Sequence, residues 1–115
     1  MSNNFPKINF YDRVVQRSLS VPVILEMSMN HCGPCLWMQK ILNDLVSEFD
    51  GELDLVCLNV SDYPELKETL NLKRNPTTIL YKDGEEKSRF TGALPAYAIE
   101  QWMDDWINKE GIYFK

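Results

Sequence analysis

Two cysteines that frame a Gly-Pro dipeptide, at residues 32–35, constrain the fold of this chain more than any other feature. They lie between an apolar, strand-like run at residues 23–27 and a helical pattern that begins at Leu36. A helix that begins at this junction directs unpaired backbone N–H groups and the positive end of its dipole toward the first sulfur, that of Cys32. The thiolate is thereby stabilised, and thiolate is the form of cysteine that attacks disulfides. The sequence therefore predicts thiol–disulfide exchange where a strand turns into a helix.

The two residues between the cysteines fit that interpretation. Pro34 suits the first turn of a helix, where its missing N–H costs nothing. Gly33 has no side chain to crowd an approaching partner, and Cys35 is near enough in sequence to close a disulfide ring with Cys32. We therefore expect Gly33 and Pro34 to lie against the substrate.

A cysteine pair with this spacing also occurs in zinc and haem sites. A structural zinc site needs about four ligands. This chain has three cysteines and one histidine, His31, which adjoins Cys32 and is poorly spaced to bind the same metal. No histidine follows Cys35, as attachment of a c-type haem would require. The sequence predicts no metal and no organic cofactor, because the cysteine pair itself carries the electrons.

Length and charge limit the class of protein. At 115 residues the chain suits one domain, covering residues 1–115, and its 44% hydrophobic content is that of a folded globular protein. Nucleic acids and anionic membranes need a basic patch, so the net charge of −5 argues against both as partners. The N-terminus lacks the basic-then-apolar layout of a signal peptide. We therefore expect a cytoplasmic protein that binds neither nucleic acid nor membrane.

Apolar patterning predicts alternating strands and helices without a linker. Residues 21–29 are apolar on both faces, which is typical of a central strand covered by helices on each side. Strands are expected at residues 7–10, 21–29, 53–60, 77–81 and 87–91, and helices at residues 11–20, 36–49, 64–70 and 99–107. The order β-α-β-α-β-α-β-β-α indicates an α/β domain built on a mixed sheet.

Several motifs together resemble the thioredoxin family. These are the Cys-Gly-Pro-Cys sequence, Asn75-Pro76-Thr77 before a strand, Lys82-Asp83-Gly84 and Gly92-Ala93-Leu94, and the likeness covers residues 7–108. The resemblance implies a thioredoxin fold, a central mixed β-sheet flanked by helices, with the dithiol at the N-terminus of the second helix. It also implies disulfide exchange with disulfide-containing protein substrates and electrons from a donor of the thioredoxin-reductase type.

The resemblance also implies catalytic roles. Cys32, at the helix end, is expected to attack the substrate, and Cys35 to resolve the mixed disulfide. Cys35 needs a base, and the candidate is Glu26, an isolated carboxyl in an apolar strand whose burial should raise its pKa. The family usually has an aspartate here. The alternative is that the Glu26 side chain reaches water.

A second set of positions is expected to bind the substrate. In the family, the proline that corresponds to Pro76 follows a cis peptide bond and lies against the dithiol. The backbone of Asn75 would then pair with an extended substrate, and Gly92 would line the same groove. Asn75 stands where the family usually has an apolar residue, so it should alter substrate preference. The alternative for Pro76 is an ordinary proline at the start of a strand.

Other positions depart from the family pattern. The family has tryptophans where this chain has Ser28 and His31. If protonated, His31 would stabilise the neighbouring thiolate and favour oxidation, or it is only an exposed polar residue. Leu36 should be exposed beside the dithiol as a docking spot. Cys57 replaces a frequent lysine near the buried acid, and we expect an inert core residue there rather than a third redox thiol.

These features predict a thiol–disulfide oxidoreductase that reduces protein disulfides. A disulfide oxidase or isomerase remains an alternative because of His31 and the altered surroundings of Glu26. A non-catalytic binding module that uses the surface at Leu36 is a further alternative.

Overall fold

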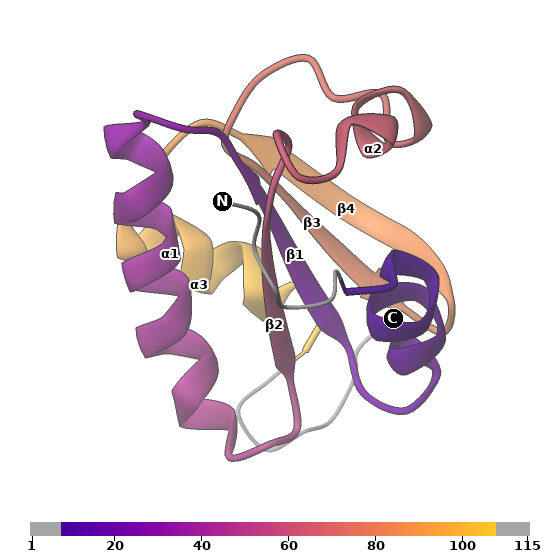
Figure 1. Cartoon of the computed structure of the whole chain (residues 1–115). Coiled ribbons are helices and arrows are strands. Elements are labelled where there is room, and N and C mark those ends of the chain that lie inside the picture. Colours follow the sequence, from indigo (N-terminus) through magenta and orange to yellow (C-terminus); the bar gives the residue numbers. More distant parts are fainter. Residues whose placement is uncertain (1–7, 108–115) are drawn as a thin grey trace.

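A computed structural model describes residues 8–107 of the chain. Its centre is a four-stranded sheet with the order β2-β1-β3-β4. The strands are β1 (Val23–Ser28), β2 (Asp54–Asn59), β3 (Thr77–Lys82) and β4 (Glu85–Thr91). β1 pairs in parallel with β2 and antiparallel with β3, and β3 pairs antiparallel with β4. The mixed sheet expected from the sequence is thus confirmed (Figure 1).

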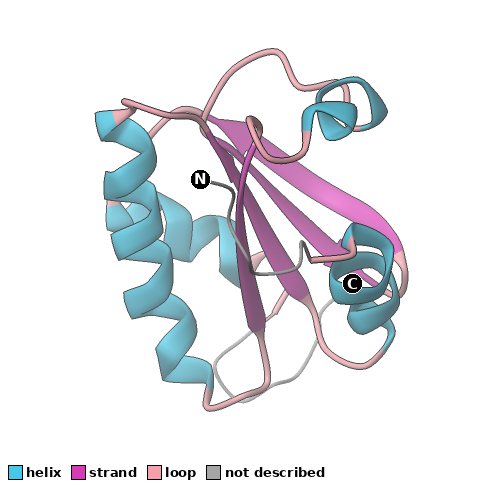
Figure 2. Ribbon diagram, in the orientation of Figure 1, coloured by secondary structure: helices cyan, strands magenta, loops and turns pink. Residues whose placement is uncertain are grey.

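Helical segments cover both faces of this sheet (Figure 2). They are η1 (Tyr11–Gln16), η2 (Arg17–Leu19), α1 (Gly33–Val46), η3 (Ser47–Phe49), α2 (Pro64–Thr69) and α3 (Ala96–Asp104). In Figure 1, α1 and α3 lie on one side of the sheet, and η1, η2 and α2 lie on the other. In the part of the chain described, no helix is long and apolar enough to cross a membrane.

The alternation of side chains along β1 divides the core into two layers. Val23, Leu25 and Met27 pack with residues of η1, α2 and β3, whereas Ile24 packs with buried residues of α1 and α3. Successive strand residues point to opposite faces, so the side chain of Glu26 lies on the same face as Ile24, under α1. β1 is buried throughout its six residues and carries one acid into the α1 layer, whereas Met29, inside the expected range 21–29, is exposed.

The expected N-terminal strand differs from the structure. Ile8 and Asn9 form no strand, and the backbone becomes helical at Phe10; Lys7 lies outside the described residues. The reason is local, because the Asn9 side chain accepts a hydrogen bond from the Asp12 N–H (3.1 Å), and Arg13 N–H donates to the Asn9 carbonyl (2.8 Å). Such bonds start a helix and compete with strand pairing.

As a result, β2 is an edge strand of the described sheet rather than a central one. Val56 and Leu58 of this strand are buried, but Cys57 between them is exposed. The expected core position of Cys57 is therefore wrong, because no described strand covers the outer side of β2. The expectation that its thiol is inert stays a prediction.

Candidate active site

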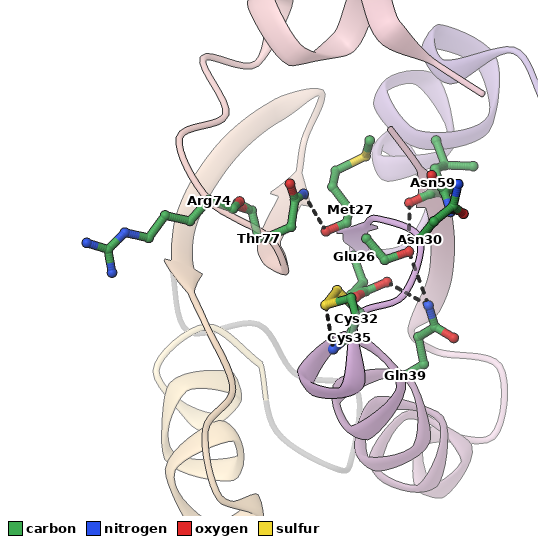
Figure 3. Close-up of a disulfide and its surroundings, with 12 residues drawn as sticks. Glu26, Met27, Asn30, Cys32, Cys35, Gln39, Asn59, Arg74 and Thr77 are labelled. Atoms are coloured by element: carbon green, nitrogen blue, oxygen red, sulfur yellow. Dashed lines mark hydrogen bonds between the residues drawn. A yellow bond between two sulfur atoms is a disulfide. The ribbon is translucent and has the colours of Figure 1, made fainter. Parts of the chain in front are cut away.

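The cysteine pair lies at the first turn of α1, directly after the loop that leaves β1. Cys32 is the N-cap of this helix, and its sulfur accepts a hydrogen bond from the Cys35 N–H at 3.1 Å. The two residues form a disulfide with a Cα–Cα distance of 5.2 Å (Figure 3). The helix begins at Gly33, earlier than the apolar pattern alone indicated, and Pro34 occupies its first turn as expected.

The two sulfurs have different surroundings. Cys32 is half-buried, whereas Cys35 is only 1% exposed. An approaching disulfide can therefore reach the first cysteine more readily than the second. The backbone N–H on the Cys32 sulfur, together with the helix dipole, favours negative charge on that atom when the pair is reduced.

Glu26 lies in the layer beneath this turn and is fully buried. The alternative that its side chain reaches water is therefore wrong. Burial raises the pKa of Glu26 from 4.5 to about 7, although hydrogen bonds from Gln39 and Cys57 act in the opposite direction. A carboxyl with this pKa exchanges its proton near neutral pH, as a base for a buried thiol requires.

Gln39 and Ser28 were not predicted as site residues. Gln39 lies one turn beyond Cys35 on α1, and its Nε2 donates to Glu26 Oε1 (3.4 Å) and to Ser28 Oγ (3.2 Å) (Figure 3). A signal was present in the sequence: Glu26 and Ser28 are two residues apart on one strand, so they share a face. A polar residue on the covering helix, four positions after Cys35, is a natural partner for that face.

The structure also brings together three residues that were predicted to bind the substrate, Asn75, Pro76 and Gly92. The Asn75–Pro76 peptide bond is cis, as the resemblance implied. The Asn75 Nδ2 donates to the Met27 carbonyl (3.2 Å), and the Gly92 N–H donates to the Pro76 carbonyl (2.8 Å). Asn75, Pro76 and Gly92 therefore form one connected unit, fastened to the end of the strand that leads into the cysteine turn.

His31 and Leu36 flank the disulfide on the surface. His31 is exposed and has a positive φ of 55°, and the Leu36 side chain is 67% exposed, as expected. Both residues line an open hollow of about 380 Å³ beside the disulfide. The residues that line this hollow are Ser28, Met29, Asn30, His31, Cys32, Cys35, Leu36, Gln39 and Asn59. Polar side chains thus occupy much of the surface where the family pattern has tryptophans.

Cys57 lies beside the buried acid, because Glu26 and Cys57 are register partners in β1 and β2. Although the residue is exposed, desolvation of its thiol, followed by the charge and hydrogen bonding of Glu26, raises the pKa of Cys57 to about 12. The thiolate is therefore scarce at neutral pH. In the described residues, no group of three or more His, Cys, Asp and Glu side chains is arranged to hold a metal ion.

Comparison with known proteins identifies the family. The thioredoxin family model matches residues 3–105. The chain is 34% identical over 89 residues to Thioredoxin M3, chloroplastic, of Oryza sativa subsp. japonica, covering 74% of this chain and 51% of that protein. It is 36% identical over 97 residues to Thioredoxin Y2, chloroplastic, of Arabidopsis thaliana, covering 84% and 58% respectively. It is 28% identical over 109 residues to Thioredoxin of Rickettsia felis, covering 95% and 98%.

The chain thus spans about half the length of the chloroplastic relatives and nearly the whole of the bacterial one. The family match covers the sheet, the cysteine turn and the segment at Pro76 together. The chain therefore belongs to the thioredoxin family.

Proposed function

We propose that this protein is a thiol–disulfide oxidoreductase that reduces disulfide bonds in other proteins. The observation that carries the proposal is the disulfide between Cys32 and Cys35 at the N-terminus of α1, with its outer sulfur at the surface and its inner sulfur buried. This arrangement can hold two electrons as a dithiol and release them as a disulfide.

The reaction has two exchanges. The Cys32 thiolate attacks one sulfur of the substrate disulfide, which forms a mixed disulfide and releases one substrate thiolate. The Cys35 thiolate then attacks the Cys32 sulfur, which restores the Cys32–Cys35 disulfide and releases the second substrate thiolate. Two electrons pass to the substrate, and the released thiolates take up two protons, those given up by the two cysteines.

Glu26 supports the second exchange in this proposal. Cys35 is only 1% exposed, so water has little access to its thiol and a nearby carboxylate can serve as its base and take its proton. A carboxylate with a pKa of about 7 accepts that proton at neutral pH and returns it to solvent later. Glu26→Gln should therefore slow release of the mixed disulfide more than its formation; equal slowing of both steps contradicts this role.

The substrate is proposed to lie over the cysteine turn. The unit of Asn75, Pro76 and Gly92 provides backbone for an extended polypeptide, and the exposed Leu36 provides an apolar contact. Gly33, Pro34 and His31 complete this surface beside the disulfide. Backbone pairing tolerates many sequences, which suits a reductase with several protein substrates.

Regeneration of the dithiol needs two electrons from a second protein, and we propose a donor of the thioredoxin-reductase type in the cytoplasm. No organic cofactor is required, because the cysteine pair carries the electrons. The family match and the bacterial relative that aligns over 98% of its length support a donor of this type.

The proposal is tested with a disulfide-containing protein such as insulin and dithiothreitol as the reductant. The protein should accelerate the reduction, and Cys32→Ser should abolish the acceleration. Cys35→Ser should instead accumulate the mixed disulfide, which mass spectrometry detects. If Cys32→Ser retains full activity in every assay, the chain is a binding module rather than an oxidoreductase.

A further inference from the structure

Gln39 connects the helix that carries the cysteines to the buried acid. Its Nε2 lies 3.4 Å from Glu26 Oε1 and 3.2 Å from Ser28 Oγ, so one amide nitrogen serves both strand residues. Figure 3 shows the Gln39 side chain extending from α1 toward the Glu26 carboxyl. Gln39 is half-buried, whereas Glu26 is fully buried and Ser28 is 5% exposed.

The orientation of the Gln39 amide follows from the bonds of Ser28. A hydroxyl has one hydrogen to donate, and Ser28 Oγ donates it to the Leu58 carbonyl at 3.3 Å. Ser28 Oγ can therefore only accept from Gln39, so the amide nitrogen and not the amide oxygen faces inward. The second hydrogen of the same nitrogen is then directed at Glu26. Ser28 thus fixes Gln39 as a donor toward the acid.

Glu26 has few other groups to stabilise its charge. β2 presents the weakly donating thiol of Cys57, and β3 presents Thr78 as the register partner of Glu26. α1 presents Gln39 and, one turn earlier, Cys35. Glu26 Oε2 has no hydrogen-bond partner among the described residues. Within residues 8–107, no cationic side chain contributes to the shift in the pKa of Glu26.

We propose that Gln39 is a positioning residue for disulfide exchange: its amide, fixed by Ser28, holds Glu26 Oε1 and leaves Oε2 to take the proton of Cys35. The inference rests on the proposed function, because it assigns the support of the base in the second exchange. The Cys35 S–H bond breaks, the proton goes to Oε2, and the sulfur electron pair forms the bond to Cys32 while the substrate thiolate leaves.

The same residues lie close to solvent. Gln39, Ser28 and Cys35 all line the hollow beside the disulfide. The acid is buried, but its hydrogen-bond partner borders the hollow, so a single side chain separates the carboxyl from solvent. A tryptophan at position 28, as in the family pattern, would place an aromatic ring where this chain has the hydroxyl that orients Gln39.

The test is the pH dependence of the second exchange, measured in single turnovers from a preformed mixed disulfide with a small aromatic thiol. Gln39→Met keeps the length of the side chain and removes the donor, so the ionised carboxyl loses its N–H partner. The midpoint of the pH profile should move upward by about one pH unit, since the free energy of a hydrogen bond to a charged group corresponds to a pKa shift of about that size. Gln39→Lys supplies a charged donor and should move the midpoint downward.

Two further variants make the result specific. Asn43→Met places the same side chain one turn later on the exposed face of α1 and should leave the midpoint unchanged. Ser28→Ala keeps Gln39 but frees its amide, and should shift the midpoint upward by less than Gln39→Met does. A ¹³C NMR titration of the Glu26 carboxyl should reproduce both directions of shift.

The outcomes separate this inference from the proposed function. Suppose that the wild type resolves the mixed disulfide, and that the pH profiles of Gln39→Met and Gln39→Lys have the same midpoint as the wild-type profile. Gln39 then has no positioning role and the inference is overturned. If both variants shift in the same direction, the effect is structural and the inference is equally overturned. If the wild-type protein does not resolve the mixed disulfide at all, the proposed function itself fails.

Discussion

Glu26 and Cys57 are register partners on adjacent strands, so a fully buried carboxyl lies beside a thiol at the sheet edge. Each group affects the ionisation of the other. The Glu26 carboxyl contributes to the rise in the pKa of Cys57, whereas the Cys57 hydrogen bond acts to lower the pKa of Glu26. The ionisation of the third cysteine of the chain is therefore coupled to that of the acid of the candidate site.

This coupling predicts that Cys57 reacts slowly with alkylating agents despite its exposure. With a pKa of about 12 instead of 9.0, its thiolate fraction at pH 8 is on the order of 1000-fold lower than that of an ordinary cysteine. Iodoacetamide labelling of the disulfide form, followed by mass spectrometry, measures this rate. Glu26→Gln removes the charge and should accelerate labelling, with Cys57→Ser as the unlabelled control. Labelling of the wild type at the rate of a free cysteine contradicts the coupling.

The buried acid should also make stability depend on pH. Between pH 4.5 and about 7 the unfolded chain loses the Glu26 proton while the folded chain keeps it, so the free energy of unfolding falls as pH rises. Relative to wild type, Glu26→Gln should gain stability with rising pH, with an upper limit of about 3 kcal/mol above pH 7. Urea unfolding of the disulfide form at pH 4 and pH 8 measures the difference. If the free energies of unfolding of wild type and Glu26→Gln differ by the same amount at both pH values, Glu26 does not titrate in this range.

Two ion pairs connect the N-terminal helical segments to the sheet. Arg13 Nη1 lies 2.7 Å and Arg17 Nε 3.4 Å from Asp54 Oδ2, at the start of β2. Burial acts to raise the pKa of Asp54, but Arg13, the Leu55 N–H and Arg17 together outweigh it and hold the pKa below its usual value of 3.8. The stabilisation is therefore present above that value and is lost as pH falls through the lower folded pKa.

Asp54→Asn should lower the free energy of unfolding by about 1 kcal/mol at pH 7, because the pair is only partly exposed. The loss should shrink toward pH 3, as the wild-type carboxylate also becomes protonated. Asp44→Asn is the matched control, since its ion pair with Lys40 is largely exposed and should contribute little. An equal effect of the two substitutions would contradict the structural role of Asp54.

His31 provides a prediction about the attacking thiol. If its protonated ring stabilises the Cys32 thiolate, His31→Ala should move the appearance of the thiolate ultraviolet absorbance to higher pH. The measurement uses the reduced protein and subtracts the spectrum of Cys32→Ser with the same substitution. If the titration of the thiolate absorbance is unchanged, His31 does not stabilise the thiolate and is only an exposed polar residue beside the site.

Much of the site could be predicted from the sequence because its determinants are local. The strand before Cys32, the start of α1 and the hairpin at Asp83-Gly84 each depend on a few adjacent residues. The burial of Glu26 followed from its apolar neighbours in the strand, and the exposure of Leu36 from helical periodicity. The cis bond before Pro76 came from the family resemblance, since no local pattern specifies it.

The features that were missed depend on contacts between distant segments. Residues 8–10 alternate like a strand, but the Asn9 cap starts a helix instead. Whether Cys57 is covered depends on which strand lies beside β2, and the residues of β2 do not encode that. The contact of Gln39 with Glu26 depends on how closely α1 packs on β1, which a one-dimensional pattern does not give.

The reduction potential of the Cys32–Cys35 pair shows whether the protein reduces or oxidises disulfides. It is measured by equilibrating the protein with glutathione or dithiothreitol buffers and quantifying the disulfide by alkylation and mass spectrometry. A protein-disulfide reductase should titrate reversibly on the reducing side, near the value of about −270 mV found for thioredoxin rather than the −120 mV of a strong oxidant. A potential well above about −200 mV would contradict the reductase assignment and favour disulfide oxidation or isomerisation. Failure to form a reversible disulfide would contradict the oxidoreductase assignment altogether.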